Sequence, residues 1–310
     1  MGFRVVYLGN DAWSVPPMIA VATTPELDLA LVMTRTPRPG RRGAGPSPTP
    51  VAVTAREMGL RTAEVETVRG GDGLRRLREA EPDVLAVVAY GEILTPAVLE
   101  LPRTGAVNLH FSLLPRWRGA SPVQHALLAG DRETGVTTML LDEGLDTGPI
   151  LARQATSVEA DDDAGRLGQR LSEIGGALLA RTLTDLATGR ATPSPQDDAA
   201  ATRAPKLTAA DRRIDWHEAA YAVLARVRAF APQPGASTTR AGRMLKILAA
   251  SETAGDGDPG RVIEVGDRWF DVAANPGAVR VLEVASESRS RMDAGSWLRG
   301  ARLEIGERLG

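Results

Sequence analysis

Residues 83–90 read DVLAVVAY, an almost unbroken run of apolar side chains. A strand that is covered by helices on both faces reads in this way, and such strands favour a parallel sheet. Shorter β-rich runs stand before it at residues 4–9 and 27–34, and after it at 106–111, 135–141 and 150–152. The stretch at 83–90 therefore predicts a buried strand of an α/β sheet.

Helical patterns separate these strands, at residues 51–58, 74–80 and 122–129. The longest pattern spans 164–187, where apolar side chains recur at a spacing near 3.6 residues. Three aspartates at 161–163 stand just before it, where negative charge suits a helix N-terminus. They lack the Gly and the distal Glu of a calcium loop, so we expect no metal. Strands that alternate with helices predict a doubly wound, Rossmann-like α/β domain over residues 1–190.

Proline and glycine interrupt the chain at two places. Residues 35–50 are dense in Pro, Gly and Arg and predict an exposed loop, and residues 191–206 are polar and Pro-rich and predict a linker. Beyond the linker one helix is expected at 219–230, followed by short strands at 245–248, 260–265, 269–273 and 279–284. Short strands at such spacing predict a small β-barrel within a second domain, residues 207–310.

The composition is that of an ordinary globular enzyme or binding protein. Of 310 residues, 43% are hydrophobic and 25% are charged, which suffices for two domains with apolar cores. Cysteine is absent, which excludes disulfides, zinc–thiolate sites and a cysteine nucleophile. No signal peptide and no membrane-spanning stretch is apparent, so we expect a cytoplasmic protein that is monomeric and has no membrane partner.

The charge balance argues against a dedicated nucleic-acid binder, because the net charge is −2. The charge is uneven, however. Residues 206–310 hold 16 Lys and Arg against 14 Asp and Glu, a net +2, and the remaining residues hold 21 against 25, a net −4. The C-terminal part therefore permits RNA contact without demonstrating it.

Two polar motifs fall at the ends of expected strands. In the sequence NLHFSLLP, Asn108 and His110 share one face of a strand, near the end where open α/β sheets place their ligands. After the next helix and strand comes DEGLDTG, residues 142–148. An amide can stabilise the oxyanion of an acyl transfer, an imidazole can move a proton near neutral pH, and a carboxylate can orient the imidazole.

Structural explanations of the same residues compete with this one. An isolated Asn-x-His triplet is common and mostly structural, and a loop rich in Asp and Gly favours turns. Ser112 could be a nucleophile, but it lacks the Gly-x-Ser-x-Gly elbow. The residues alone predict no more than an α/β enzyme with a polar site at adjacent strand ends.

The order of the motifs is more specific than any one of them. It runs Asn108-x-His110, Ser112-Leu113-Leu114-Pro115, Arg118-Gly119-Ala120 and Asp142-x-Gly144-x-Asp146-x-Gly148. The segment resembles the formyltransferase family that uses 10-formyltetrahydrofolate. Shorter likenesses, such as Arg213-Ile214-Asp215-Trp216 and Gly306-Glu307-Arg308-Leu309-Gly310, extend it over nearly the full chain. The resemblance implies a Rossmann-like catalytic domain and a C-terminal OB-like barrel.

The resemblance also implies roles for individual residues. Asn108, His110 and Asp146 would be the catalytic trio, with 10-formyltetrahydrofolate as formyl donor and co-substrate. The donor would bind near two backbone segments, one with Val88, Tyr90 and Gly91 and one with Asp142, Glu143 and Gly144. The floor of its pocket would be shaped by Ser112, Leu113, Leu114 and Pro115, with a cis bond before the proline.

Within the family, the likeness favours the members whose acceptor is methionyl initiator tRNA, which supply N-formylmethionyl-tRNA for translation initiation. Phosphate contacts would come from Arg38, Arg41 and Arg42, since guanidinium groups suit phosphates, and a tRNA contact from Lys206. Asn10 and Trp13 would lie near the amino-acid substrate. A solvated flexible loop at 35–50 is the competing interpretation.

The sequence departs from the family pattern at three places. It reads Asn10-Asp11-Ala12-Trp13 after Gly9 where the family has Thr-Pro-x-Phe. It has Ala44-Gly45-Pro46 where lysines are frequent, and Gln233 where an aromatic residue is common. The first two changes put the acceptor in question.

Three other functions stay open at this point. An amino-sugar or small-amine formyltransferase would share the same trio but would not need the C-terminal domain. A formyltetrahydrofolate hydrolase would use water, and normally carries a regulatory domain before the catalytic one. An RNA-binding module without catalysis would not need Asn108, His110 and Asp146 in register.

Overall fold

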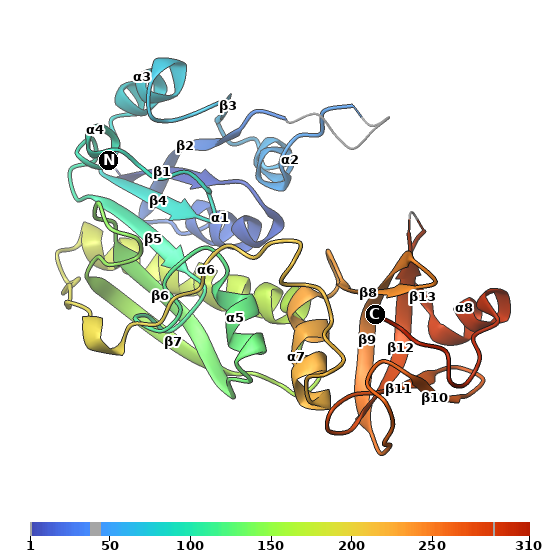
Figure 1. The fold of residues 1–310 in the computed structure, drawn as a ribbon. Helices are drawn as coiled ribbons and strands as arrows, with labels where there is room; N and C mark the ends of the chain where they lie inside the picture. Colours follow the sequence, from blue (N-terminus) through green and yellow to red (C-terminus); the bar gives the residue numbers. More distant parts are fainter. Residues whose placement is uncertain (1, 38–44, 288) are drawn as a thin grey trace. The chain divides into compact units, whose positions relative to one another are not determined.

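The computed structural model describes residues 2–37, 45–287 and 289–310 (Figure 1). The described residues form two compact units. Unit 1 comprises Met1–Pro122, Glu133–Ser157 and Gly168–Pro205, and unit 2 comprises Val123–Arg132, Val158–Leu167 and Lys206–Gly310. Most of the expected linker, up to Pro205, is therefore part of unit 1.

Unit 1 is built on a seven-stranded sheet with the strand order β3-β2-β1-β4-β5-β6-β7. The strands are β1 (Phe3–Gly9), β2 (Leu27–Arg35), β3 (Thr62–Val65), β4 (Val84–Val88), β5 (Ala106–His110), β6 (Glu133–Leu140) and β7 (Ile150–Ser157). The five strands from β3 to β5 are parallel, β6 runs antiparallel to β5, and β7 runs antiparallel to β6. The expected parallel, Rossmann-like sheet is confirmed, with two antiparallel strands added at one edge.

All five residues of β4 are buried, which explains why this strand reads as a continuous apolar run. The helices up to residue 200 are η1 (Ala12–Ser14), α1 (Val15–Ala22), α2 (Pro50–Glu57), α3 (Gly71–Ala80), α4 (Pro96–Leu99), α5 (Pro122–Leu128), α6 (Ala164–Ala187) and η2 (Asp198–Ala200). All of α5 after Pro122 and the first turn of α6 are assigned to unit 2. Helix α6 has the predicted bounds. Asp163 accepts from the backbone N–H of Arg166 at 2.8 Å, so this aspartate caps the helix.

Unit 2 is antiparallel. It contains α7 (Ala220–Phe230), β8 (Ala236–Arg240), β9 (Arg243–Thr253), β10 (Val262–Val265), β11 (Phe270–Ala273), β12 (Ala278–Ser286), β13 (Met292–Asp293) and α8 (Ala294–Ala301). The strand order is β10-β11-β12-β9-β8, and β13 pairs with β12. The C-terminal residues bridge to both edges, Leu309 to Arg240 and Arg308 to Arg261. They link the two edge strands, as closure into a small barrel requires.

In the described part of the chain, no helix has the length and apolar content to cross a bilayer.

Candidate active site

Strand β5 carries two of the expected catalytic residues. It pairs with β4 on one side and β6 on the other, with Asn108 opposite Val87 and Met139. Asn108 and His110 are two residues apart, so their side chains leave the same face of the sheet. Among the described residues, Asn108 makes no side-chain hydrogen bond, which leaves both of its amide N–H groups available to a ligand.

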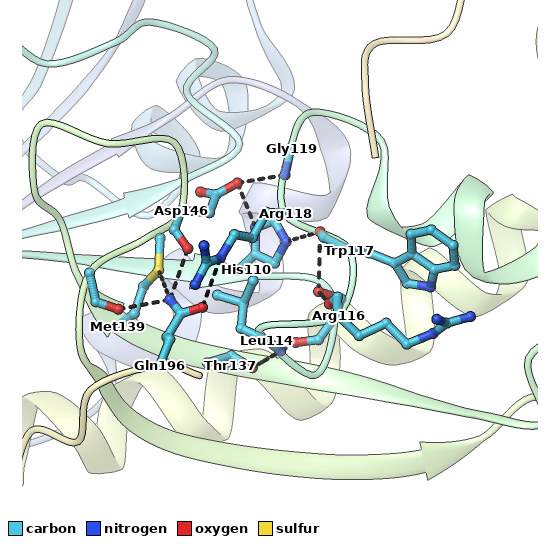
Figure 2. Close-up of polar contacts among 12 residues, drawn as sticks. His110, Leu114, Arg116, Trp117, Arg118, Gly119, Thr137, Met139, Asp146 and Gln196 are labelled. Atoms are coloured by element: carbon cyan, nitrogen blue, oxygen red, sulfur yellow. Dashed lines mark hydrogen bonds and ion pairs between the residues drawn. The ribbon is translucent and has the colours of Figure 1, made fainter. Parts of the chain in front are cut away.

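The imidazole of His110 is only 6% exposed and is held at one nitrogen. Its Nε2 lies 2.8 Å from the backbone carbonyl oxygen of Trp117 (Figure 2). Because a carbonyl oxygen can only accept, this contact places a proton on Nε2. The other nitrogen, Nδ1, lies 3.7 Å from Oδ2 of Asp146. Nδ1 is therefore the ring atom that can gain or lose a proton beside the carboxylate.

Asp146 lies on the loop between β6 and β7. Its Oδ2 accepts from the backbone N–H of Gly119 at 2.8 Å, which fixes the carboxylate beside the imidazole. Its backbone is left-handed, with φ 55°, a conformation that L-residues adopt only when their surroundings hold them there. The loop is also tightly packed, because a Cβ added at Gly148 would lie 1.8 Å from the carbonyl oxygen of Leu140.

These three residues line one cavity of about 580 Å³ in unit 1. Its lining also includes the backbone of residues 89–91 and apolar side chains from both sides, namely Ile93, Leu94, Leu99, Leu141 and Leu145. Ile93 and Leu145 are 73% and 57% exposed, so the cavity has an apolar rim that is open to solvent. Apolar walls around a few polar groups are typical of a site for a flat organic ligand.

The cavity includes some of the residues expected to bind folate. Tyr90, Gly91, Asp142 and Gly144 line it. Asp142 also orders its own loop, since its Oδ1 accepts from the backbone N–H of Gly144 at 3.0 Å and from Thr147 Oγ1 at 2.8 Å. Glu143 is exposed on the same loop, and Val88 is fully buried at the end of β4.

The segment expected to shape the floor, residues 112–115, follows directly on β5 but is not among the residues that line the cavity. Ser112 is fully buried and donates to the backbone oxygen of Arg116 at 2.7 Å. Leu114 packs in a core cluster with Met139 and Ile150, while Leu113 and Pro115 are half-buried. The peptide bond before Pro115 is cis, as the resemblance implied.

Two titratable groups at the cavity differ from their ordinary behaviour. Burial, and next to it the charge of Glu92, raises the pKa of Tyr90 well above its usual value, so its hydroxyl stays neutral. Burial also raises the pKa of Asp11, although hydrogen bonds from Ser14 oppose the shift. Residues 2–37, 45–287 and 289–310 contain no group of three or more His, Cys, Asp or Glu side chains that could hold a metal ion.

The residues expected at the acceptor have structural partners. The amide oxygen of Asn10 accepts from Thr34 Oγ1 at 2.9 Å and from the backbone N–H of Arg35 at 2.8 Å, and its nitrogen donates to the backbone oxygen of Tyr90. Asn10 thus joins the ends of β1, β2 and β4, beside a second hollow of about 410 Å³.

Trp13 packs inside unit 1. Its ring centroid is 6.0 Å from that of Phe111, a cavity residue, and its indole fills the space where a Cβ on Gly168 would lie. Lys206 is exposed at the start of a segment of unit 2. Arg38, Arg41 and Arg42 lie outside the described residues.

Sequence reasoning missed a group of residues that hold the site from outside. The segment of residues 194–204, named here the strap, runs past the loop of Asp146 and past residues 115–121, and bonds to both. Its composition predicted a linker. The one available signal was Gln196, an amide that stands between two prolines and two aspartates.

An amide, an imidazole and a carboxylate around one cavity, at the end of a parallel strand, define an enzyme of the group-transfer class in which a carbonyl carbon is attacked. The chain belongs to the formyl transferase family: residues 5–183 match the domain described as formyl transferase, and residues 206–302 match the formyl transferase C-terminal domain.

Relatives match the chain along its length. The methionyl-tRNA formyltransferase of Magnetococcus marinus is 41% identical over 308 residues, which cover 99% of this chain and 98% of that protein. That of Halorhodospira halophila is 42% identical over 309 residues, with 99% of each chain covered.

Solved structures with little sequence identity share the fold. HypX from Aquifex aeolicus, in complex with tetrahydrofolic acid, superposes with a TM-score of 0.68 at 18% identity, over 99% of this chain and 49% of HypX. An N-formyltransferase from Helicobacter canadensis superposes with a TM-score of 0.67 at 15% identity, over 91% of this chain and 98% of that one.

Proposed function

We propose that this enzyme transfers the formyl group of 10-formyltetrahydrofolate to the α-amino group of methionyl initiator tRNA. The observation that carries the proposal is the convergence of Asn108, His110 and Asp146 on one cavity. The full-length relatives named methionyl-tRNA formyltransferase support the choice of acceptor. The product is N-formylmethionyl-tRNA, which is used to initiate translation.

The cavity suits the donor. A pterin is flat, with an apolar face and a hydrogen-bonding edge. The exposed apolar rim at Ile93 and Leu145 offers contact to the face. Backbone groups of residues 89–91 and 142–145 offer partners to the edge. We place the donor there, with Val88, Ser112, Leu113, Leu114 and Pro115 supporting the walls from within the core and Glu143 at the solvent side.

The proposed reaction is a direct transfer. The amine nitrogen forms a bond to the formyl carbon, and the carbonyl oxygen takes on negative charge. Asn108 donates a hydrogen bond to that oxygen, which is worth about 3–4 kcal/mol of the barrier. The bond from the formyl carbon to the folate nitrogen then breaks. The amine loses one proton and the folate nitrogen gains one, so tetrahydrofolate leaves neutral at that atom.

The chain's own groups account for the proton movement. Nε2 of His110 is occupied by its bond to Trp117, so Nδ1 is the atom that exchanges a proton with the reacting groups. The carboxylate of Asp146, 3.7 Å away, stabilises the imidazolium while it carries that proton. Asp146 thus acts by its charge and by orienting the ring, without being protonated itself.

For the acceptor we propose three regions: residues 1–190 as the catalytic domain, 191–206 as the connection, and 207–310 as the tRNA-binding domain. Support comes from the net charge of +2 over residues 206–310. Arg38, Arg41, Arg42 and Lys206 are proposed to contact the tRNA, and Asn10 and Trp13 to shape the wall beside the methionine. Replacement of Arg42 by Ala should raise the KM for charged tRNA, and an unchanged value would argue against the role of that loop.

The test uses purified full-length protein, 10-formyltetrahydrofolate, and one acceptor at a time: methionyl initiator tRNA, uncharged initiator tRNA, or a nucleotide-linked amino sugar. Mass spectrometry of the acceptor should show one formyl group on the charged tRNA alone. Formylation of the amino sugar alone would replace this proposal by the second acceptor class. Release of formate with no formylated acceptor would identify a hydrolase.

Asn108→Ala should lower kcat by about 10²–10³-fold while the protein stays folded, because its amide has no structural partner to lose. A rate near that of the wild type would overturn the assignment of the site. We also propose that the enzyme acts as a monomer in the cytoplasm. Light scattering of the purified protein tests the first point, and fractionation of the cells that make it tests the second.

A further inference from the structure

The strap, residues 194–204, is hydrogen-bonded at both ends to other segments of unit 1. At its start Ser194 pairs with Ile150 through two backbone hydrogen bonds of 2.7 and 2.8 Å. At its end Ala204 donates to the backbone oxygen of Arg118 at 2.7 Å and accepts from the backbone N–H of Ser121 at 3.2 Å. A segment that is held at both ends is not a free linker. Between its ends it contacts the loop that carries Asp146.

The side chain of Gln196 grips the loop of Asp146 (Figure 2). Its Nε2 donates to the backbone oxygen of Asp146 and to that of Gly148, both at 2.8 Å. Its Oε1 accepts from Nε of Arg118 at 3.0 Å. The same nitrogen also lies 3.9 Å from Sδ of Met139. Both N–H groups and the oxygen of this amide are therefore used, and two of its four contacts end on the loop that carries the carboxylate.

The grip falls where the backbone is strained. Asp146 has φ 55°, a left-handed conformation that is unfavourable at a residue other than glycine. Such a conformation persists only when its surroundings impose it. The bond from Gln196 to the carbonyl of the same residue is a contact of that kind, because it fixes the peptide plane next to the strained bond.

The C-terminal end of the strap holds Trp117, the hydrogen-bond partner of His110, in a similar way. Trp117, whose carbonyl accepts from His110, also has a positive φ, 66°. Its backbone N–H donates to Thr202 Oγ1 at 3.0 Å, and the backbone N–H of Arg118 donates to the carbonyl of Thr202 at 2.9 Å. Gly119, which donates to the carboxylate, packs so closely on Ala204 that an added Cβ would lie 2.4 Å from the Ala204 oxygen.

We infer that Gln196 is a positioning residue for the reaction, which holds the carboxylate of Asp146 close enough to His110 to stabilise the imidazolium, with Thr202 as its counterpart on the histidine side. The inference rests on the proposed function. Gln196 acts through the loop and through Arg118, and touches neither substrate. Loss of its two N–H donors frees a strained loop to relax, and a displacement of about 1 Å at a reacting group can cost about 10²-fold in rate.

The experiment compares Gln196→Ala with Gln169→Ala, a matched change at an exposed glutamine whose amide bonds, within the described part of the chain, only to Glu173. In Gln196→Ala we expect kcat to fall about 10- to 100-fold, while KM for 10-formyltetrahydrofolate stays within about threefold of the wild type. Gln169→Ala should keep both values. Unchanged kcat in folded Gln196→Ala would overturn the inference, and so would an equal loss of kcat and of affinity for tetrahydrofolate.

Gln196→Glu covers the case in which the alanine variant does not fold. It keeps the shape and the bond to Arg118, but sets a carboxylate against the two backbone oxygens. Its kcat should be low at neutral pH and should recover toward the wild type as the pH falls, because the protonated acid regains one O–H donor. A pH profile parallel to that of the wild type would count against the positioning role.

A spectroscopic readout separates this inference from the proposed function. The chain has only three histidines, so the ring ¹⁵N signals of His110 can be assigned with a His110→Gln variant. Gln196→Ala should shift these signals and Gln169→Ala should not. If the wild type formylates no tested amine, the proposed function fails, and the shift of the His110 signals still decides whether the strap sets this geometry. Identical His110 spectra in all three proteins would refute it.

Discussion

The carbonyl oxygen of Trp117 accepts the Nε2 proton of His110 at 2.8 Å, and this contact decides which ring nitrogen meets the reactants. With Nε2 protonated, the neutral ring presents a lone pair at Nδ1, on the side of Asp146. Attraction between the ring and the carboxylate arises only when Nδ1 also carries a proton. In the proposed mechanism the carboxylate therefore acts on the imidazolium, the form that appears once the ring has taken a proton from the attacking amine.

The first prediction follows from this attraction between the protonated ring and the carboxylate of Asp146. Asp146→Asn keeps the size of the side chain but removes its charge, so the imidazolium is no longer stabilised. We expect kcat to fall by up to about 10⁴-fold, the loss that follows when the carboxylate of a catalytic triad is neutralised. Steady-state kinetics at saturating donor measures the effect. Asp161→Asn, at an exposed aspartate paired with Arg166, is the control and should keep the wild-type rate.

The second prediction concerns the packing of the loop between β6 and β7, which carries Asp146. In Gly148→Ala the new methyl group would stand 1.8 Å from the carbonyl oxygen of Leu140, a backbone atom that has no room to move. We expect a loss of about 2 kcal/mol or more in the free energy of unfolding, together with loss of activity. Gly70→Ala has open space around the added Cβ and should change neither. Urea unfolding and the formyl-transfer assay measure the two effects. Equal behaviour of the variants would show that the loop is looser than described.

The third prediction tests a buried ion pair in unit 2. Asp271 on β11 is 1% exposed and accepts from Nε and Nη2 of Arg280 on β12, at 2.9 and 2.8 Å. Arg280→Met leaves that carboxylate buried without its cation, which should lower the free energy of unfolding in urea. Adding Asp271→Val removes the unpaired charge and should restore at least half of the loss. A double variant as unstable as the single one would mean that packing, and not the charge, is what Arg280 contributes.

The fourth prediction is a dependence of stability on pH. Hydrogen bonds from Arg240, at 2.7 and 3.0 Å, lower the pKa of Glu307 below its ordinary value of about 4.3. The folded state thus favours the charged carboxylate. Its contribution to stability is complete above the unfolded pKa and is lost as the pH falls through the folded pKa.

Glu307→Gln should therefore lower the thermal midpoint at pH 7, and the difference from the wild type should shrink when the pH is brought below about 4. Glu252→Gln makes the same change of charge at an exposed residue of β9 and serves as the reference. A difference that stays constant from pH 7 to pH 3.5 would exclude the ion pair as its source.

The parts of the fold that were predictable from sequence are those whose pattern is set by burial alone. Strand β4 is buried along its length, and helix α6 buries one stripe with Leu167, Leu171 and Leu183, so each has an unambiguous period. The four barrel strands β9 to β12 were found for the same reason. Their bounds moved by a few residues because pairing, and not the apolar pattern, fixes where a strand ends.

The missed elements are short or carry conflicting signals. Strand β3 has only four residues. Helix α1 has only eight residues and carries two prolines near its start, where Pro is well tolerated because the first turn does not need its N–H groups. Strand β8 reads ASTTR and has few large apolar side chains. Helix α8 contains two glycines, Gly295 and Gly300, which lower its helix propensity. Tertiary contacts decide these elements.

The grouping of the proposed catalytic trio was predictable because strand periodicity puts Asn108 and His110 on one face, and the family motif supplies Asp146. The strap was not, because a run of Pro, Asp and Ala has no period. The acceptor residues show a similar limit: Asn10 departs from the family pattern, and the structure gives its amide three partners within the sheet. Nothing local in a sequence shows which distant backbone groups a side chain will meet.

The strap sets a condition on the order in which a new chain becomes competent. Synthesis runs from the N-terminus at about 5–20 residues per second, so Asp146 leaves the ribosome several seconds before Gln196, which holds its carbonyl. By then every strand of the first sheet, through Ser157, has been made. A chain stopped at that stage could complete its sheet and bring both β5 residues into line, yet the carboxylate of Asp146 would stay loose until translation had passed the strap.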